Sequence, residues 1–150
     1  MKITFVGHAF VFSSDEIKER VKNAIKNNVI GVESVECYIG GYGDFDDLCA
    51  EACRELRRDG YDLSIIYVTP YLVSSEQTKI RRMQEEKLFD YSIYPPIESV
   101  PMRLAIIKRN EWMVKNSDLI IAYVKHNYGG AYRTLQVAKR NSKIIIDVCD

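Results

Sequence analysis

Residues that could bind or transform a small ligand recur at one kind of position in this sequence, directly after short β-branched runs. Gly7-His8 follows the first run, Gly40-Gly41-Tyr42-Gly43 the second, Thr69-Pro70-Tyr71 the third, and residues 125–130 the fourth. If the runs are parallel strands of one sheet, these loops share the edge at which open α/β sheets bind ligands. Glycine lets backbone amides approach a ligand, and the N-terminus of a following helix attracts an anion. We therefore expect a ligand site at this edge, with tight turns that need positive φ as the alternative explanation of the glycines.

The two glycine turns differ in charge. Asp44, Asp46 and Asp47 open the helix that follows the first turn. Such carboxylates either cap the helix or accept hydrogen bonds from ribose hydroxyls, and they disfavour phosphate. The second turn, residues 128–134, contains no acid and carries Arg133, so we expect phosphate there.

Three further polar side chains allow more than one interpretation. His8 either contacts a ligand or bonds to backbone, and His126 is interpreted as a polar loop residue. Arg109 precedes the fourth run on a predicted helix, where an isolated arginine is ordinarily a solvated charge. Four tyrosines could stack on a base or pack at the rim: Tyr42, Tyr71, Tyr128 and Tyr132.

The alternation of strand-like and helical patterns predicts an α/β fold, a Rossmann-like three-layer domain with a mostly parallel, five-stranded sheet. The expected strands are residues 2–7, 35–39, 63–69, 119–124 and 143–148. Residues 72–100 break the rhythm, with a helix near 74–87 and then an aromatic segment stiffened by Pro95-Pro96. We interpret 72–100 as an insertion over the sheet edge, either a lid or a surface excursion without a role.

Composition narrows the function. The 150 residues form one expected domain, 1–150, and their zero net charge argues against DNA, RNA or an anionic membrane as a partner. No signal peptide or membrane span is recognisable, so we expect a cytoplasmic protein. None of the four cysteines lies in a CxxC pair, which favours reduced core thiols over a metal site or disulfide. We expect no metal and no cofactor.

Taken in order, these motifs resemble the YpsA-like branch of the SLOG superfamily, which joins the Smf/DprA proteins and the LOG enzymes. The resemblance rests on Gly7-His8, the turn from Tyr38 to Asp46, Val68-Thr69-Pro70-Tyr71, Arg109 with Met113, Ser117-Asp118 and Gly129-Gly130-Ala131. It covers nearly the whole chain apart from 72–100. It implies a Rossmann-like fold that binds nucleotides or nucleotide-derived ligands, and a homodimer or larger assembly.

LOG enzymes hydrolyse the N-glycosidic bond of a nucleoside monophosphate, using a motif that ends in Pro-Gly-Gly-x-Gly-Thr-x-x-Glu. Here the proline is absent, and Thr134 and Gln136 are the nearest equivalents of the threonine and the glutamate. A carboxylate stabilises the oxocarbenium-like state of glycosidic cleavage, and a glutamine has no such charge. The remaining candidates for catalysis are Arg109, Asp46 and Asp47, the two acids reaching the site from the other glycine turn.

Three functions follow from these residues. The first is binding or sensing of a nucleotide or nucleotide-derived ligand without catalysis, and the alternative is a nucleoside monophosphate N-glycosidase. The third, nucleic-acid binding, is disfavoured because the sequence has no dense basic stripe. The residues expected to contact the ligand are Gly7, His8, Gly40, Gly41, Gly43, Asp46, Thr69, Pro70, Tyr71, Arg109, Gly129, Gly130, Ala131 and Thr134.

Overall fold

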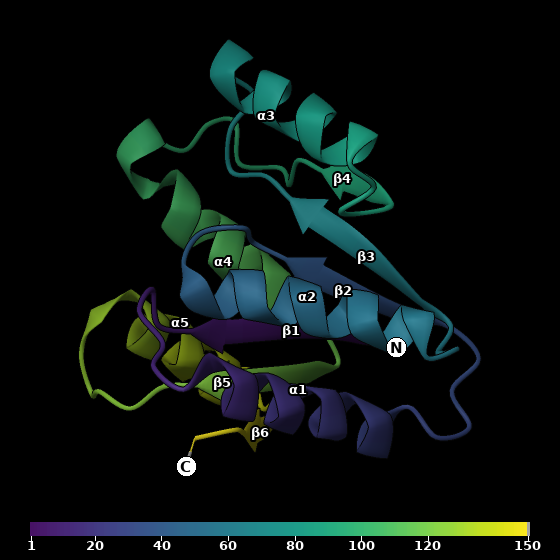
Figure 1. Ribbon diagram of the computed structural model, residues 1–150. Coiled ribbons are helices and arrows are strands. Elements are labelled where there is room, and N and C mark those ends of the chain that lie inside the picture. Colours follow the sequence, from purple (N-terminus) through teal and green to yellow (C-terminus); the bar gives the residue numbers. More distant parts are fainter. Residues whose placement is uncertain (150) are drawn as a thin grey trace.

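A six-stranded sheet forms the centre of the computed structural model, which describes residues 1–149 (Figure 1). All five strand pairings are parallel, and the strand order is β4-β3-β2-β1-β5-β6. The strands are β1 Lys2–Gly7, β2 Val35–Ile39, β3 Leu63–Val68, β4 Tyr91–Ile93, β5 Leu119–Tyr123 and β6 Ile144–Asp147. The helices are α1 Ser14–Asn28, α2 Asp44–Arg58, α3 Ser74–Glu85, α4 Ala105–Lys115 and α5 Gly129–Arg140, with a 3-10 turn Met102–Leu104 before α4.

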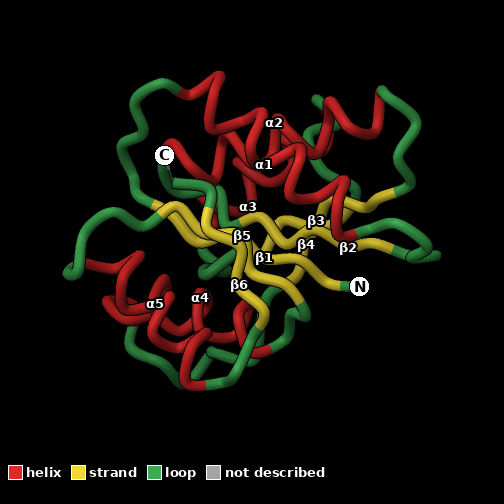
Figure 2. Tube along the Cα trace, turned by 90° about the horizontal axis from the view of Figure 1, so that it is seen from below, coloured by secondary structure: helices red, strands yellow, loops and turns green. Residues whose placement is uncertain are grey.

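Helices cover both faces of the sheet and make three layers. Figure 2 shows α1 and α2 on one face and α4 and α5 on the other. The apolar stripe of α2, with steps of three and four residues, is buried along its whole length: Phe45, Leu48, Cys49, Ala52, Cys53 and Leu56. The expected Rossmann-like α/β architecture is therefore confirmed, because helices cover both faces of a parallel sheet.

Two expectations about residues 72–100 need correction. The sheet has six strands rather than five, and the additional strand β4 lies inside the segment that we interpreted as an insertion. Helix α3 and strand β4 continue the strand–helix rhythm, with Ile66 opposite Tyr91 and Val68 opposite Ile93. The strand escapes sequence analysis because it has only three residues and Pro95 follows closely, and a strand this short shows no alternation.

One side chain fastens β4 to the sheet. The backbone N–H of Asp90 donates to the carbonyl of Ile65 at 2.8 Å, and the Asp90 carboxylate accepts from the N–H of Ile65 at 2.7 Å. Arg57 at the end of α2 donates to the same carboxylate at 2.9 Å. Strand β4 within residues 72–100 therefore extends the sheet at the β3 side.

The Ser117-Asp118 pair holds β5 beside β1. The hydroxyl oxygens of Thr4 and Ser117 lie 2.6 Å apart, and the Asp118 carboxylate accepts from the N–H of Lys2 at 2.8 Å. The chain order reverses between these two strands, since β2, β3 and β4 lie on one side of β1 and β5 and β6 on the other. In open α/β sheets, such a switch point opens a crevice at the carboxyl ends of the strands.

The anchoring of β4 can be tested by replacing Asp90 with alanine. Asp90→Ala leaves the partly buried N–H of Ile65 unpaired, so we expect the free energy of unfolding to fall by about 1–3 kcal/mol. Amide hydrogen exchange at Ile65 and across 91–93 is expected to rise in the same variant. Asp62→Ala, at an exposed acid just before β3, is the matched control. Unchanged denaturation and exchange in Asp90→Ala would contradict the anchoring.

Candidate functional site

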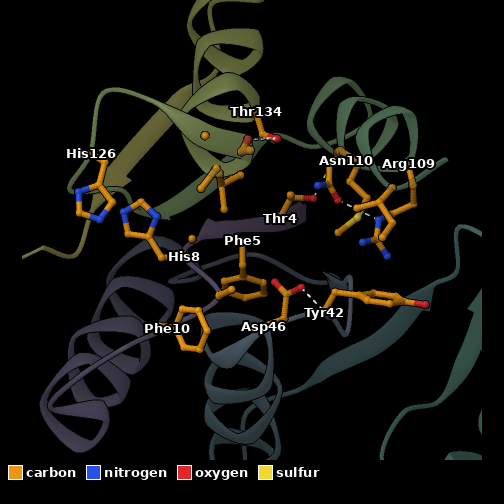
Figure 3. Close-up of a pocket in the computed structure, with 18 of the residues that line it drawn as sticks. Thr4, Phe5, His8, Phe10, Tyr42, Asp46, Arg109, Asn110, His126 and Thr134 are labelled. Carbon is orange, nitrogen blue, oxygen red and sulfur yellow. Dashed lines mark hydrogen bonds between the residues drawn. The ribbon is translucent and has the colours of Figure 1, made fainter. Parts of the chain in front are cut away.

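A cavity of about 400 Å³ opens at the switch point (Figure 3). Its walls come from β1 and the loop after it, the first turn of α2, helix α4 and the beginning of α5. Eight of the predicted ligand residues line it: Gly7, His8, Asp46, Arg109, Gly129, Gly130, Ala131 and Thr134. Both glycine-marked regions of the sequence therefore contribute to a single cavity.

The other predicted residues lie outside its described lining. They are Gly40, Gly41, Gly43, Thr69, Pro70 and Tyr71, together with the catalytic candidate Asp47. Sequence reasoning missed several lining residues: Thr4, Phe10, Ile106, Asn110 and Met113. Three of these lie on α4: Ile106 three positions before Arg109, Asn110 directly after it and Met113 four positions after it. Helical spacing from Arg109 could have identified Ile106 and Met113.

Gly7, at the end of β1, and the glycines at the start of α5 have different roles. A Cβ at Gly7 would come within 2.3 Å of the Phe45 ring, so this glycine lets α2 pack closely on β1. Gly129 has φ +90, and a Cβ at Gly129 or Gly130 would meet no described heavy atom within 4 Å. The turn at Gly129-Gly130 is therefore open toward the cavity, whereas the space beside Gly7 is occupied by the ring of Phe45.

The N-terminus of α5 supplies the cavity with unpaired amide donors. The helix begins Gly129-Gly130-Ala131, and its first turn contains no acid. Within residues 1–149, no side chain caps it, and Thr134 donates to the carbonyl of Gly130 at 3.0 Å. The positive end of the helix dipole and the N–H groups of the first turn would suit an anion, and phosphate at this turn stays a prediction of the sequence. Arg133 is exposed and lies outside the described lining.

Arg109 is buried rather than solvated, with 1% of its surface exposed. Its Nη1 donates to the carbonyls of Gly40 and Val68, each at 2.7 Å, and Nε donates to Asn110 Oδ1 at 2.9 Å. These bonds tie α4 to the ends of β2 and β3. Burial lowers the pKa of Arg109, and the nearby carboxylate of Asp46 opposes that change.

Asp46 and Asp47 separate in the structure. Asp46 faces the cavity and accepts from the N–H of Tyr42 at 2.9 Å, whereas Asp47 is exposed. Burial raises the pKa of Asp46 to about 6, although the bond from Tyr42 and the charge of Arg109 both act to lower it. A Cβ at Gly40 would lie 3.0 Å from the Asp46 carboxylate and 3.1 Å from Arg109 Nη2. A side chain at position 40 would therefore require these two charged groups to shift.

His8 bonds to backbone, the second of its two interpretations, and also lines the cavity. Its Nε2 accepts from the N–H of Lys125 at 2.7 Å, which places the proton of the neutral ring on Nδ1. Burial lowers the pKa of His8, and His126 and Lys125 add to that effect. The rings of His8 and His126 lie 4.6 Å apart, and His126 stacks on Tyr128 at 5.1 Å. With the exposed ring of Phe10, they form an aromatic wall at the mouth of the cavity.

The described residues offer no metal centre. Among residues 1–149, no group of three or more histidine, cysteine, aspartate or glutamate side chains could hold a metal ion. Cys37, Cys49 and Cys53 are buried free thiols. No helix in the same part of the chain is long and apolar enough to cross a membrane.

The structure is a Rossmann-like α/β fold with a cavity at the switch point of its sheet. No protein-family model and no curated protein sequence matches this chain. Among solved structures, DNA processing protein A (DprA) from Helicobacter pylori is similar with a TM-score of 0.64 and 14% identity, over 98% of this chain and 64% of that one. DprA from Streptococcus pneumoniae is similar with a TM-score of 0.66 and 16% identity, over 97% of this chain and 49% of that one.

These similarities bear on the fold and on one expectation about partners. Both neighbours are DprA proteins, which agrees with the SLOG resemblance at the level of the fold, and this chain spans about half to two thirds of their length. The expectation that nucleic acid is not a partner is wrong, because the Helicobacter pylori protein of this fold is described by its single-stranded DNA binding mode. A zero net charge is therefore not sufficient to exclude nucleic-acid binding by a protein of this fold.

The raised pKa of Asp46 predicts how stability depends on pH. The folded protein binds more protons than the unfolded chain between about pH 4 and 6, so its free energy of unfolding falls as the pH rises through that window. We expect Asp46→Asn to remove this loss, and the variant to gain about 1–3 kcal/mol relative to wild type between pH 4 and pH 7. Urea denaturation at several pH values measures the difference. Asp59→Asn, at the exposed end of α2, should show none; parallel pH profiles for wild type and Asp46→Asn would refute the assignment.

Proposed function

We propose that the cavity binds or senses a nucleotide or a nucleotide-derived ligand without transforming it. The observation that carries the proposal is the acid-free, glycine-rich N-terminus of α5, which opens into a cavity whose mouth is aromatic. The volume of about 400 Å³ lies within the usual range for small-molecule sites.

The phosphate would lie at the start of α5. The amides of Gly129, Gly130 and Ala131 are available to its oxygens, and the helix dipole adds attraction. Among side chains, Thr134 stands one turn further along α5 and also lines the cavity. Backbone rather than basic side chains would therefore do most of the binding, which fits a chain without a basic stripe.

The base and the ribose would occupy the rest of the cavity. Phe10, His126 and Tyr128 contribute exposed rings to its lining, and a base can stack on such rings. Asp46 and Asn110 lie deeper, where a carboxylate can accept and an amide can donate hydrogen bonds to ribose hydroxyls. In this arrangement the phosphate lies at the acid-free turn before α5, and the ribose lies near Asp46 from the acidic turn before α2.

We also propose that residues 1–150 form one nucleotide-binding domain of the SLOG type, in its YpsA-like branch, and that the protein is cytoplasmic. The order of the motifs around the cavity supports the first point, since Gly7-His8, Asp46, Arg109 and Gly129-Gly130 all line one site. The free thiols of Cys37, Cys49 and Cys53 support the second.

Hydrolysis of an N-glycosidic bond is the alternative, and the position of Asp46 favours it. A carboxyl group with a pKa of about 6 lies in the same cavity as the anion site and beside Arg109. As the carboxylate, it could stabilise an oxocarbenium-like state, whereas Asp47 is exposed outside the lining. Release of adenine from AMP by wild type but not by Asp46→Asn would establish the alternative, and intact AMP would leave the binding proposal in place.

A second candidate is that the site holds one nucleotide of single-stranded DNA. The likeness to the Helicobacter pylori protein suggests it, and two exposed aromatic side chains that line the cavity favour it. Phe10 and Tyr128 are 81% and 67% exposed, and single-stranded nucleic acids stack on such rings. An anion site beside exposed rings would suit a strand as well as a free nucleotide.

The phosphate site predicts opposite outcomes for two substitutions of Gly130. A side chain at this position meets open space, so Gly130→Asp introduces a negative charge without a clash. We expect Gly130→Asp to weaken AMP binding at least 10-fold in calorimetry, because the carboxylate repels the phosphate at the helix start. Gly130→Ala is the matched control and should bind within about 3-fold of wild type. An AMP affinity that is unchanged in Gly130→Asp would exclude the phosphate site at α5.

The aromatic side chains at the cavity predict how the protein binds single-stranded oligonucleotides. Single-stranded oligonucleotides should bind wild type more weakly as salt rises, and Phe10→Ala and Tyr128→Ala should each lower affinity about 5- to 100-fold, the usual loss for one stacked base. Tyr61→Ala, half-exposed at the opposite edge of the sheet, is the control. Fluorescence anisotropy with a labelled oligonucleotide measures both effects; equal affinities for all four proteins would remove this candidate.

A further inference from the structure

Glu76 is a buried carboxylate on α3, outside the described lining of the cavity. It is 6% exposed and accepts three hydroxyl hydrogen bonds, from Tyr67 at 2.7 Å, Thr69 at 3.0 Å and Tyr42 at 3.2 Å. Lys79, one turn further along α3, donates to the Tyr67 hydroxyl at 3.2 Å. A buried carboxylate is tolerated only when it is paired or hydrogen-bonded in this way. The network joins α3 to the end of β3 and to the turn after β2.

Few side chains hold α3 on the domain. Of its twelve residues, only Glu76 and Ile80 are buried. Ile80 packs into the apolar core that β3 and α2 share, and Glu76 makes the polar connection. The position of α3 therefore depends strongly on the three hydroxyls that Glu76 accepts from.

Tyr42 connects this network to the cavity. Two cations lie over its ring, with Lys79 Nζ 4.5 Å and the Arg109 guanidinium carbon 5.3 Å from the ring centre. The backbone N–H of Tyr42 donates to Asp46, and Tyr42 itself lines the cavity. Gly41 and Gly43 flank it with φ values of +74 and +108. A turn with glycines on both sides is free to rearrange once the ring is released.

We infer that Glu76 is a positioning residue, which holds Tyr42 in place as a wall of the nucleotide cavity and so makes ligand affinity depend on the docking of α3. The inference rests on the proposed function. The link is the hydroxyl of Tyr42, which reaches Glu76 while the backbone of the same residue holds Asp46. The coupling is reciprocal, so a bound nucleotide stabilises the docked α3.

A double-mutant cycle on AMP affinity tests the coupling. Tyr42→Phe keeps the ring and removes only the hydroxyl, and Glu76→Gln keeps the shape and removes the charge. We expect each to weaken AMP binding about 5- to 10-fold, and the double variant to be no weaker than the single ones, because both remove the same link. Tyr91→Phe, which loses a hydroxyl bond to Glu36 at the exposed edge, should bind as wild type. Losses that multiply in the double variant would overturn the inference.

A measurement without ligand separates this inference from the proposed function. Amide exchange of Tyr42 should rise at least 10-fold in Tyr42→Phe (measured at residue 42) and in Glu76→Gln, while that of Ile39 in β2 stays unchanged. If wild type fails to bind AMP and the exchange still rises, the nucleotide proposal fails and the positioning role stands. If exchange at residue 42 is unaffected in both variants, the positioning role is excluded whatever the affinities show.

Discussion

The buried guanidinium of Arg109 is the interaction on which the site depends. Where β2 and β3 end, their last carbonyls leave the sheet and lose the partners that a strand would supply. One nitrogen of Arg109, Nη1, donates to the carbonyls at both strand ends, with bonds of 2.7 Å to Gly40 and to Val68. The same group lies near Asp46 and over Tyr42, so it fixes α4, two strand ends and one wall of the cavity together. An arginine can do this because its donors form a rigid planar fork.

The cavity itself follows from topology. The chain reverses direction across the sheet between β1 and β5, so the loops after these strands diverge toward opposite faces. His8 accepts from the N–H of Lys125 at 2.7 Å and so links the loops that follow β1 and β5, and Ser117 fastens the start of β5 to β1 through Thr4. A motif such as Ser117-Asp118 is therefore explained here by strand pairing, while the glycines at the start of α5 face open space. Resemblance to a family does not distinguish residues that hold strands together from residues that face the cavity. The contacts of each residue make that distinction.

The sequence was sufficient for the layered fold and for the acid-free turn, because apolar periodicity and glycine position are local signals. It was insufficient where the outcome depends on direction or on distant partners. Asp46 and Asp47 are adjacent, yet a helical step of about 100° points one into the cavity and leaves the other in solvent. Glu76 had no local signal beyond an acid near a helix start, since its three donors come from residues up to 34 positions away. Strand β4 is too short to show a pattern, and only its pairing with β3 defines it.

Net charge is a poor guide to the partners of such a site, because the potential inside a cavity is local. At the proposed site, the start of α5 would attract an anion without contributing a formal charge, while the charge of Arg109 is directed at carbonyls. Backbone amides and a helix dipole attract phosphate without altering the sum of lysine and arginine over aspartate and glutamate. The two counts of 21 therefore cancel over the chain, and that balance does not decide whether the proposed site at α5 holds a phosphate. A balanced composition restricts long basic tracks along nucleic acid, but it leaves recognition of single nucleotides, free or within a strand, to the geometry of one loop and one helix end.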